Sequence, residues 1–274
     1  MNVPEWEDPR RVLARHGLNA KRRFSQNFLT SRSAIESIAR ALSLKANEPV
    51  VELGPGVGTL TAALLREGAR VIAIEADHDM IDVLSAELGN QERLRVEHGD
   101  ATTIDLKALS PRPVAVAGNL PYAITGAIFR QLVDQYPQVD RAVVMVQREV
   151  RDRLLSAPGR KQYGALTVFT SAVFEVAPVC LVPAGAFHPA PKVDSAVIAL
   201  SRRAEPVDPA RPTFSRAVRA AFEARRKTLR NALQRSFPID HVDAGLAGAG
   251  IDGNRRGETL SVREFDALAR ALTG

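Results

Sequence analysis

The chain has 274 residues, of which 45% are hydrophobic and 25% charged, and its formal net charge is +6. This composition is typical of a folded globular protein and argues against extensive disorder. The length allows one large α/β domain with a small second domain.

No apolar run approaches the roughly 20 residues that span a bilayer, and the first residues do not form a basic-then-apolar leader. The single cysteine, Cys180, fits a reducing compartment. We therefore expect a cytoplasmic protein that is neither secreted nor inserted in a membrane.

Short runs rich in β-branched residues alternate with helical periodicities. The runs predict strands at residues 50–53, 70–75, 94–97, 114–117, 142–147, 176–182 and 196–201. Helices are predicted between the first of these, at residues 59–66, 80–88 and 124–133. This alternation predicts an α/β fold with an open, doubly wound parallel sheet, which binds ligands beyond the carboxyl ends of its strands.

The composition changes at residues 203–212, where prolines and scattered charges indicate a linker. We therefore predict two domains, with residues 1–203 forming the α/β domain and residues 204–274 forming a helical C-terminal domain.

The first predicted strand runs into the corner Glu52-Leu53-Gly54-Pro55-Gly56-Val57-Gly58-Thr59. Such glycines let the backbone approach a nucleotide at the start of a helix. The alternatives are a tight structural turn and a dinucleotide fingerprint, which would use an acidic residue such as Glu75 about 20 residues further on. The glycines lack the dinucleotide spacing, and Glu52 lies within the strand end, which favours S-adenosylmethionine.

Gly99-Asp100-Ala101 follows the third predicted strand. The Asp100 carboxylate is placed to accept a hydrogen bond from an adenine amino group. A helix cap is the alternative role for this residue.

The fourth predicted strand ends at Asn119-Leu120-Pro121-Tyr122. An adenine N6 amine is a poor nucleophile because its lone pair is delocalised into the ring, so catalysis needs acceptors that orient it. The Asn119 side chain and the Leu120 carbonyl are predicted to be those acceptors, with Pro121 holding the corner rigid. Tyr122 offers an aromatic face for a flipped base, although a proline turn with a core tyrosine is the structural alternative.

A second aromatic residue, Phe187, opens the segment Phe187-His188-Pro189-Ala190-Pro191-Lys192-Val193-Asp194-Ser195. We predict that Phe187 forms the opposite wall of the stacking pocket, a role worth ~1–3 kcal/mol, unless it belongs to the core. His188 has no partner at metal-ligand spacing, so no metal site is predicted.

The tail carries clustered positive charge. If residues 214–235 form one helix, a rotation of about 100° per residue groups its cations on one face. Five cations with only Glu223 nearby favour contact with RNA phosphates over a solvated face. These cations are Arg216, Arg219, Arg226, Lys227 and Arg230, whereas Arg225 falls on the apolar side.

Together these segments resemble the ribosomal RNA adenine N6-dimethyltransferase family, of the KsgA type, over nearly the whole chain. The resemblance begins at Ser25-Gln26-Asn27-Phe28-Leu29, where Ser25 replaces the usual glycine. It implies a Rossmann-like class I S-adenosylmethionine-dependent methyltransferase domain, with residues 1–30 as a cofactor-binding arm. The cofactor-binding residues that it implies are Gln26, Asn27, Leu29, Glu52, Gly54, Gly56, Gly58, Glu75, Ala76, Asp100, Ala101 and Asn119.

The same resemblance implies that residues 119–122 form the catalytic motif, that Phe187 stacks on the base, and that Arg219, Arg226, Lys227 and Arg230 bind RNA. It further implies a monomer that dimethylates two adjacent adenines near the 3′ end of small-subunit rRNA during assembly of the small subunit. A macrolide-resistance branch that modifies large-subunit rRNA, a nicotinamide-dependent oxidoreductase and an RNA-binding assembly factor without activity are the alternatives.

Overall fold

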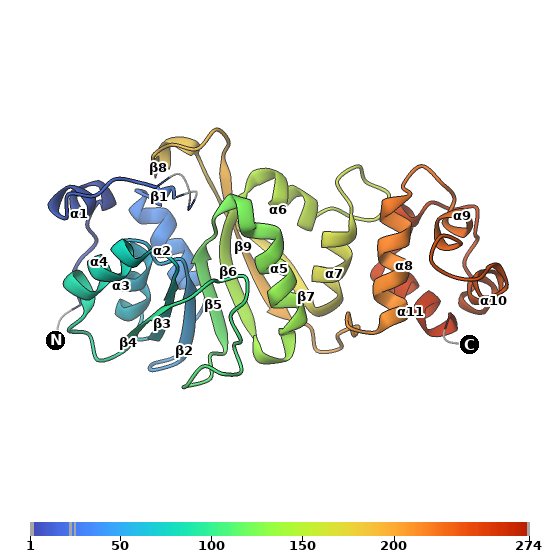
Figure 1. Cartoon of the computed structure of the whole chain (residues 1–274), viewed down its shortest axis with the longest axis horizontal. Coiled ribbons are helices and arrows are strands. Elements are labelled where there is room, and N and C mark those ends of the chain that lie inside the picture. Colours follow the sequence, from blue (N-terminus) through green and yellow to red (C-terminus); the bar gives the residue numbers. More distant parts are fainter. Residues whose placement is uncertain (1–2, 22–23, 25, 273–274) are drawn as a thin grey trace. The chain divides into compact units, whose positions relative to one another are not determined.

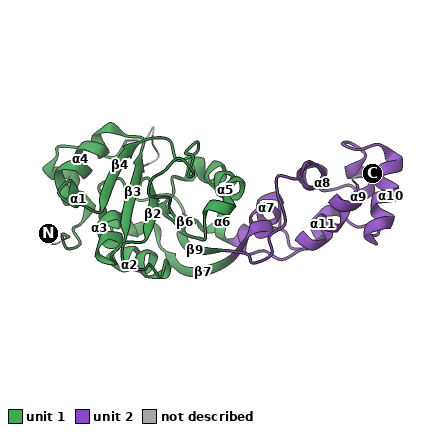
Figure 2. Cartoon of the chain, turned by 90° about the horizontal axis from the view of Figure 1, so that it is seen from below, with its two compact units in different colours: residues 1–151, 176–201 green, residues 152–175, 202–274 purple. Residues whose placement is uncertain are grey.

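The computed structural model describes residues 3–21, 24 and 26–272 (Figure 1). The chain forms two compact units, one of residues 1–151 and 176–201 and the other of residues 152–175 and 202–274 (Figure 2). One boundary falls after residue 201, whereas the predicted domain limit follows residue 203. Residues 152–175, however, belong to the second unit.

That excursion carries α7 (Ala165–Val173), which packs into the core of the second unit. The Phe169 ring meets the Phe214 ring edge-on at 6.1 Å between centroids, and the Tyr163 hydroxyl donates to the Leu260 carbonyl at 2.8 Å. A helical sequence pattern shows that one face is apolar, but it does not show which hydrophobic core that face packs against. The sequence therefore did not indicate that residues 152–175 belong to the second unit.

The first unit is built on a mixed sheet whose strand order is β4-β3-β2-β5-β6-β9-β7 among the described residues. The strands from β4 to β6 run parallel, and β9 pairs with β6 in the antiparallel direction. The predicted strands are confirmed, with limits shifted by a few residues at most. Their bounds are β2 (Pro49–Leu53), β3 (Arg70–Glu75), β4 (Leu94–His98), β5 (Ala115–Asn119), β6 (Arg141–Gln147), β7 (Phe174–Val182) and β9 (Ser195–Arg202).

Helices cover the sheet because the central strands are apolar on both faces. Val50, Val51 and Leu53 of β2 are all buried, as a parallel strand between two helical layers requires. The helical elements are α1 (Pro9–Arg15), α2 (Arg32–Ala41), α3 (Thr59–Arg66), α4 (His78–Leu88), η2 (Tyr122–Ile124), α5 (Thr125–Asp134), η3 (Tyr136–Gln138), α6 (Arg148–Leu154) and η4 (Ala184–Ala186). No helix of the described residues combines the length and apolarity needed to cross a membrane.

The strand order reverses between β2 and β5, since β2 continues to β3 on one side and pairs with β5 on the other. Open α/β sheets bind ligands at such a switch point. Gly118 keeps the two strand ends close, because a Cβ there would lie 2.7 Å from the Leu53 carbonyl oxygen. The corners that follow β2 and β5 are therefore neighbours.

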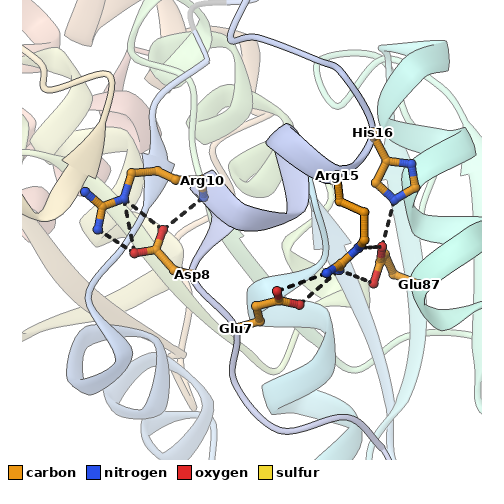
Figure 3. A network of polar contacts seen from close by, with 6 residues as sticks. All are labelled: Glu7, Asp8, Arg10, Arg15, His16 and Glu87. Atoms are coloured by element: carbon orange, nitrogen blue, oxygen red, sulfur yellow. Dashed lines mark hydrogen bonds and ion pairs between the residues drawn. The ribbon is translucent and has the colours of Figure 1, made fainter.

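The N-terminal arm is fastened to the first unit. Arg15 at the end of α1 bonds both Glu7 and Glu87 of α4, and the ring of His16 bonds Glu87 at 2.7 Å (Figure 3). Such exposed pairs contribute little stability individually. Buried contacts reinforce them, because Val12 and Leu13 pack with Phe28, Val57, Met80 and Val83. A short strand, β1 (Phe28–Leu29), then pairs antiparallel with β8 (Phe187–His188).

The second unit is helical among its described residues, apart from the start of β7 and the end of β9. Its elements after α7 are α8 (Pro212–Glu223), α9 (Leu229–Leu233), α10 (Ile239–Ala249), η5 (Gly257–Thr259) and α11 (Val262–Ala271). The prediction of one helix over residues 214–235 is therefore wrong. Thr228 caps a new helix by accepting from the Asn231 N–H, while the Leu229 N–H donates to the Arg255 carbonyl at 2.6 Å.

We predict that Gly58→Ala destabilises the fold by roughly 2–4 kcal/mol. Gly58 precedes α3 with φ +87°, and an added Cβ would lie 2.9 Å from the side chains of Leu84 and Leu88 of α4. Gly17→Ala is the matched control, because Gly17 has φ +66° and nothing within 4 Å of the added Cβ. Urea unfolding of the two variants measures the difference. Equal losses would mean that packing against α4 is unimportant.

Candidate active site

A cavity of about 300 Å³ lies beyond the carboxyl ends of β2, β3, β4 and β5. Its volume is within the range of small-molecule binding pockets. The predicted residues that line it are Gln26, Asn27, Leu29, Glu52, Gly54, Gly56, Glu75, Ala76, Asp100, Ala101, Asn119, Leu120, Pro121 and Tyr122. The structure thus brings together the residues predicted to bind the cofactor and the tetrapeptide predicted to be catalytic, with Gly58 and Phe187 as the exceptions. Ser25, also part of the resemblance, lies outside the described residues.

The glycine corner forms the floor of the cavity. Gly54 and Gly56 have φ of +69° and +56°, a backbone conformation that favours glycine. A Cβ on Gly56 would lie 3.0 Å from Cε1 of Phe28, so the ring of the N-terminal arm rests on bare backbone. Gly58 does not line the cavity. Its missing side chain makes room for Leu84 and Leu88, which corrects the expectation that it approaches the cofactor.

Glu75 ends β3 with its carboxylate held by backbone. One oxygen accepts from the N–H groups of Ala76 and Asp77 at 2.9 Å each, and the other accepts from the Gly56 N–H at 3.1 Å. Burial raises the pKa of this carboxyl, although the three backbone hydrogen bonds oppose the shift. Since a carboxylate oxygen offers two acceptor sites, the oxygen bonded to Gly56 keeps one for a ligand hydroxyl.

Glu52 is the most buried carboxyl of the cavity, with 1% of the residue exposed. Burial raises its pKa to about 8, and the nearby Glu75 charge acts in the same direction, whereas a 2.6 Å hydrogen bond from the Thr61 hydroxyl opposes the shift. Glu52 is therefore mostly protonated at neutral pH, so it presents a neutral carboxyl to the cavity rather than an anion.

Asp100 does not cap a helix of the described residues, which was the alternative role predicted for it. One carboxylate oxygen accepts from the backbone N–H and the hydroxyl of Thr102, both at 2.8 Å, which closes a local turn. Because no hydrogen bond to the second oxygen is formed within the described part of the chain, that oxygen is available at the cavity wall.

The Asn119 amide is oriented by the arm. Its Nδ2 donates to the backbone carbonyl of Asn27 at 2.9 Å, so its Oδ1 is the free end of the amide. The next residue, Leu120, donates its N–H to Met145 of β6 at 3.2 Å, and no described residue donates to its carbonyl. Two acceptor atoms therefore stand at the end of β5, and their contact with a target amine stays a prediction.

Pro121 and Tyr122 complete the corner. The Pro121 carbonyl accepts from the Thr125 hydroxyl at 3.1 Å and from the Ile124 N–H at 3.2 Å, which fixes the turn into α5. Half-buried Tyr122 lines this cavity and also a more open hollow of about 510 Å³ beside it. That second hollow is bordered by Gln147 and by the prolines of the 187–195 segment.

Phe187 does not form the opposite wall in this structure. It is 5% exposed, pairs with Leu29 across the β1–β8 ribbon and belongs to a hydrophobic core cluster with Ile35, Ile38 and Leu42 of the α2 region. The observed position is that of a core aromatic residue, which was the alternative expectation for Phe187. Its short strand is apolar at Phe187 and exposed at His188, so ribbon pairing sends the ring inward.

Gln26 lines the cavity and also helps to hold the N-terminal arm against Asp77, the residue that precedes α4. Its amide oxygen accepts from the Lys21 N–H at 2.8 Å, and its amide nitrogen donates to Asp77 at 2.8 Å. Lys21 Nζ in turn lies 2.6 Å from Asp77 and 2.6 Å from Asp79. Both ends of the Gln26 amide are thus occupied by the clamp that attaches the arm to the start of α4.

Sequence reasoning missed Asp77 and Gly118. Asp77 is 1% exposed, and burial would raise its pKa, but hydrogen bonds from Lys21 and Gln26 outweigh that effect and lower it. A charged residue two positions after a strand end was a usable signal. Gly118 had a signal too, since a glycine inside an apolar strand often marks close backbone approach.

The predicted RNA-binding cations differ in their surroundings. Arg230 is paired with Asp243 through hydrogen bonds of 2.6 and 2.7 Å, so the expectation that only Glu223 lies near these cations is wrong. Arg219 lies over the Phe169 ring at 5.8 Å. Arg226 and Lys227 lie exposed between α8 and α9, and neither forms an ion pair with a described residue.

Comparison with known proteins places this site in a family. The model of the family described as ribosomal RNA adenine dimethylase matches residues 17–273. The chain belongs to this family. A relative from Myxococcus xanthus named ribosomal RNA small subunit methyltransferase A is 47% identical over 97% of this chain and 95% of its own length.

Solved structures of family-like enzymes share the fold. A dimethyladenosine transferase from Plasmodium falciparum is 27% identical, covers 88% of this chain and 95% of its own, and superposes with a TM-score of 0.76. The 23S rRNA methyltransferase ErmE is 31% identical, covers 90% of this chain and 100% of its own, and has a TM-score of 0.68. The family member described here therefore has the class I methyltransferase fold.

We predict that Glu52→Gln stabilises the ligand-free protein increasingly as pH rises. The native carboxyl keeps its proton up to about pH 8, whereas the unfolded one loses it near 4.5. Above that lower value the native state binds more protons than the unfolded state, so wild-type stability falls as pH approaches 8. Gln removes this loss, and its advantage should grow by roughly 3 kcal/mol between pH 5 and 8.

Urea unfolding of both proteins across this pH range is the measurement. Any constant effect of the substitution on packing cancels in the comparison of pH values. A difference that does not change with pH would mean that Glu52 is ionised in the folded protein at neutral pH.

Proposed function

We propose that this protein transfers methyl groups from S-adenosylmethionine to the N6 amines of two adjacent adenines near the 3′ end of small-subunit rRNA. The observation that carries the proposal is the Asn119 amide, whose Nδ2 is held by the Asn27 carbonyl so that Oδ1 and the Leu120 carbonyl remain as acceptors beside the glycine corner.

The cavity fits the methyl donor. Gly54 and Gly56 expose backbone, Glu75 retains an acceptor for a ribose hydroxyl, and Asp100 retains an oxygen for an adenine amino group. When bound, S-adenosylmethionine supplies an electrophilic methyl group on a sulfonium. The rest of the catalysis is positioning by the residues of the chain.

Asn119 and Leu120 orient the nucleophile. When both hydrogens of an adenine amine are held by acceptors, the nitrogen lone pair is turned away from the ring plane and toward the methyl group. Each transfer releases one amine proton to solvent, so one hydrogen remains after the first transfer and a single acceptor is enough for the second. Tyr122 offers its face to a base that has left its stack. No dedicated base is required.

A nicotinamide-dependent reaction on the same sheet leaves the acceptor pair at the end of β5 unexplained, and family membership argues against it. Small-subunit rRNA is favoured over large-subunit rRNA as the target. The relative of Myxococcus xanthus with the small-subunit name is 47% identical to this chain, whereas ErmE is 31% identical.

The proposed setting is the cytoplasm, where the monomeric enzyme acts on the assembling small ribosomal subunit. RNA contact is assigned to the helical part of the chain after residue 203, with Arg226 and Lys227 as its main phosphate contacts. Their exposure, and the fact that neither forms an ion pair with a residue that the structure describes, support this role. Arg219 and Arg230 are secondary, because the first is held over Phe169 and the second is paired with Asp243.

We predict that the wild-type protein incorporates labelled methyl groups into undermethylated small subunits, and that Asn119→Ala lowers turnover by about two orders of magnitude or more. Cofactor affinity should change little, because the substitution removes an acceptor for the amine but leaves the glycine corner. Methyl incorporation and calorimetric titration with S-adenosylmethionine measure the two quantities. Binding without incorporation by the wild type would instead support the inactive assembly factor, and tight binding of NAD alone would support the oxidoreductase.

We predict that Arg226→Ala combined with Lys227→Ala reduces the salt dependence of RNA affinity. Each lost phosphate contact removes about 0.7 to 0.9 from the slope of log affinity against log salt, so the slope should fall by about 1 to 2. Arg70→Ala combined with Arg112→Ala is the matched control, since both residues are exposed at the amino-terminal side of the sheet. Equal slopes for the two double variants would mean that Arg226 and Lys227 only face solvent.

A further inference from the structure

We propose that Ser195 is a positioning residue for methyl transfer, acting through a hydrogen bond that fixes the ring of Tyr122. This inference rests on the proposed function, because it assigns a role to a side chain that supports the target base. Ser195 does not itself line either cavity.

The contact is short and buried at one end. The Tyr122 hydroxyl lies 2.6 Å from the Ser195 hydroxyl, and Ser195 is 0% exposed. Tyr122 itself is half-buried and lines both the main cavity and the more open hollow beside it. The ring therefore has one edge tethered in the interior while part of its surface is available to a ligand.

Tyr122 is held from its backbone as well. It follows Pro121, whose ring restricts the chain, and the Thr125 hydroxyl bonds the Pro121 carbonyl at 3.1 Å. These contacts fix where the ring begins but leave rotation about the side-chain bonds. The bond to Ser195 removes that remaining freedom, so the orientation of the ring is set before a base arrives.

Ser195 is well placed to be a rigid anchor. It opens β9 and pairs with Gln147 at the end of β6, a strand adjacent to β5. The preceding residue, Asp194, is fixed at two points, since its carbonyl accepts from the Arg148 N–H and its carboxylate accepts from the Ala184 N–H, both at 3.0 Å. Displacing Ser195 would therefore disturb the sheet. The Tyr122 hydroxyl is thus bonded to a fixed partner.

The orientation of the ring matters because stacking is a surface contact. A target base on a tilted ring would present its amine away from Asn119 Oδ1, even if it still entered the pocket. Loss of the tether should then reduce turnover more than binding, since misoriented complexes form but react slowly.

The test is a double-mutant cycle with Ser195→Ala, Tyr122→Phe and the combined variant, measured on undermethylated small subunits. Each single change should lower kcat by about three- to tenfold while the KM for the subunit and the Kd for S-adenosylmethionine change less than twofold. The combined variant should be no slower than the slower single variant, because both changes remove the same hydrogen bond.

Thr167→Val is the control for losing a buried hydroxyl that contributes only stability. Thr167 is 2% exposed in α7 and donates to the Arg153 carbonyl at 2.8 Å. This variant should lower the melting temperature and leave kcat unchanged. If Ser195→Ala does not fold, Tyr122→Phe removes the same bond from the other side and should show the kcat loss alone.

Rate losses that multiply in the combined variant, or a wild-type kcat in Tyr122→Phe, would overturn the role of the hydrogen bond. Both results presuppose an active wild-type protein. Absence of methyl transfer by the wild type would instead contradict the proposed function, so the two failures are distinguishable.

Discussion

The active site depends on the parallel pairing of β2 with β5. In this register Glu52 lies opposite Ala117, so the chain leaves the two strands at Gly54 and Asn119 side by side. One corner offers bare backbone and the other offers acceptors. Gly118 makes the pairing close, because any side chain there would collide with the Leu53 carbonyl. Strand order reverses at this point, and open α/β sheets bind ligands in the crevice at such a reversal.

Hydrogen bonds within the protein then determine which atoms of the site remain for ligands. Three backbone N–H groups hold the Glu75 carboxylate, Thr102 occupies one oxygen of Asp100, and Asn27 occupies the nitrogen of the Asn119 amide. Each contact fixes a side chain and leaves a defined acceptor. Such preorganisation avoids reorienting polar groups during reaction, which is where a positioning enzyme gains most of its rate. The N-terminal arm participates directly, since it supplies Asn27 and, through Lys21 and Gln26, surrounds Asp77.

The second unit shows why charge counts along a sequence are weak evidence. A single long helix would have gathered the cations on one face without partners. Instead α8 ends at Glu223, and acidic residues distant in sequence form ion pairs with two of the arginines. Glu258 pairs with Arg225 at 2.9 Å, and Asp243 pairs with Arg230 at 2.6 Å. Arg216 and Arg219 have no acidic partner among the described residues but lie over the rings of Phe237 and Phe169. Arg226 and Lys227, in the turn between the helices, are exposed and form no ion pair with a described residue, which selects them from the larger set.

The sequence by itself determined the alternation of strands and helices, the glycine corner and the position of residues 119–122 at a strand end, because these depend on local periodicity and on residues that directly follow strands. The helix over residues 59–66 coincides with α3, and the acceptors at Asn119 and Leu120 lie where the pattern placed them. Only the tertiary structure decided which glycines face the cavity, since Gly56 meets Phe28 of the arm whereas Gly58 meets α4. It also decided that Phe187 packs in the core and that residues 152–175 join the second unit. These outcomes depend on contacts between segments far apart in the chain, and local patterns carry no information about such partners.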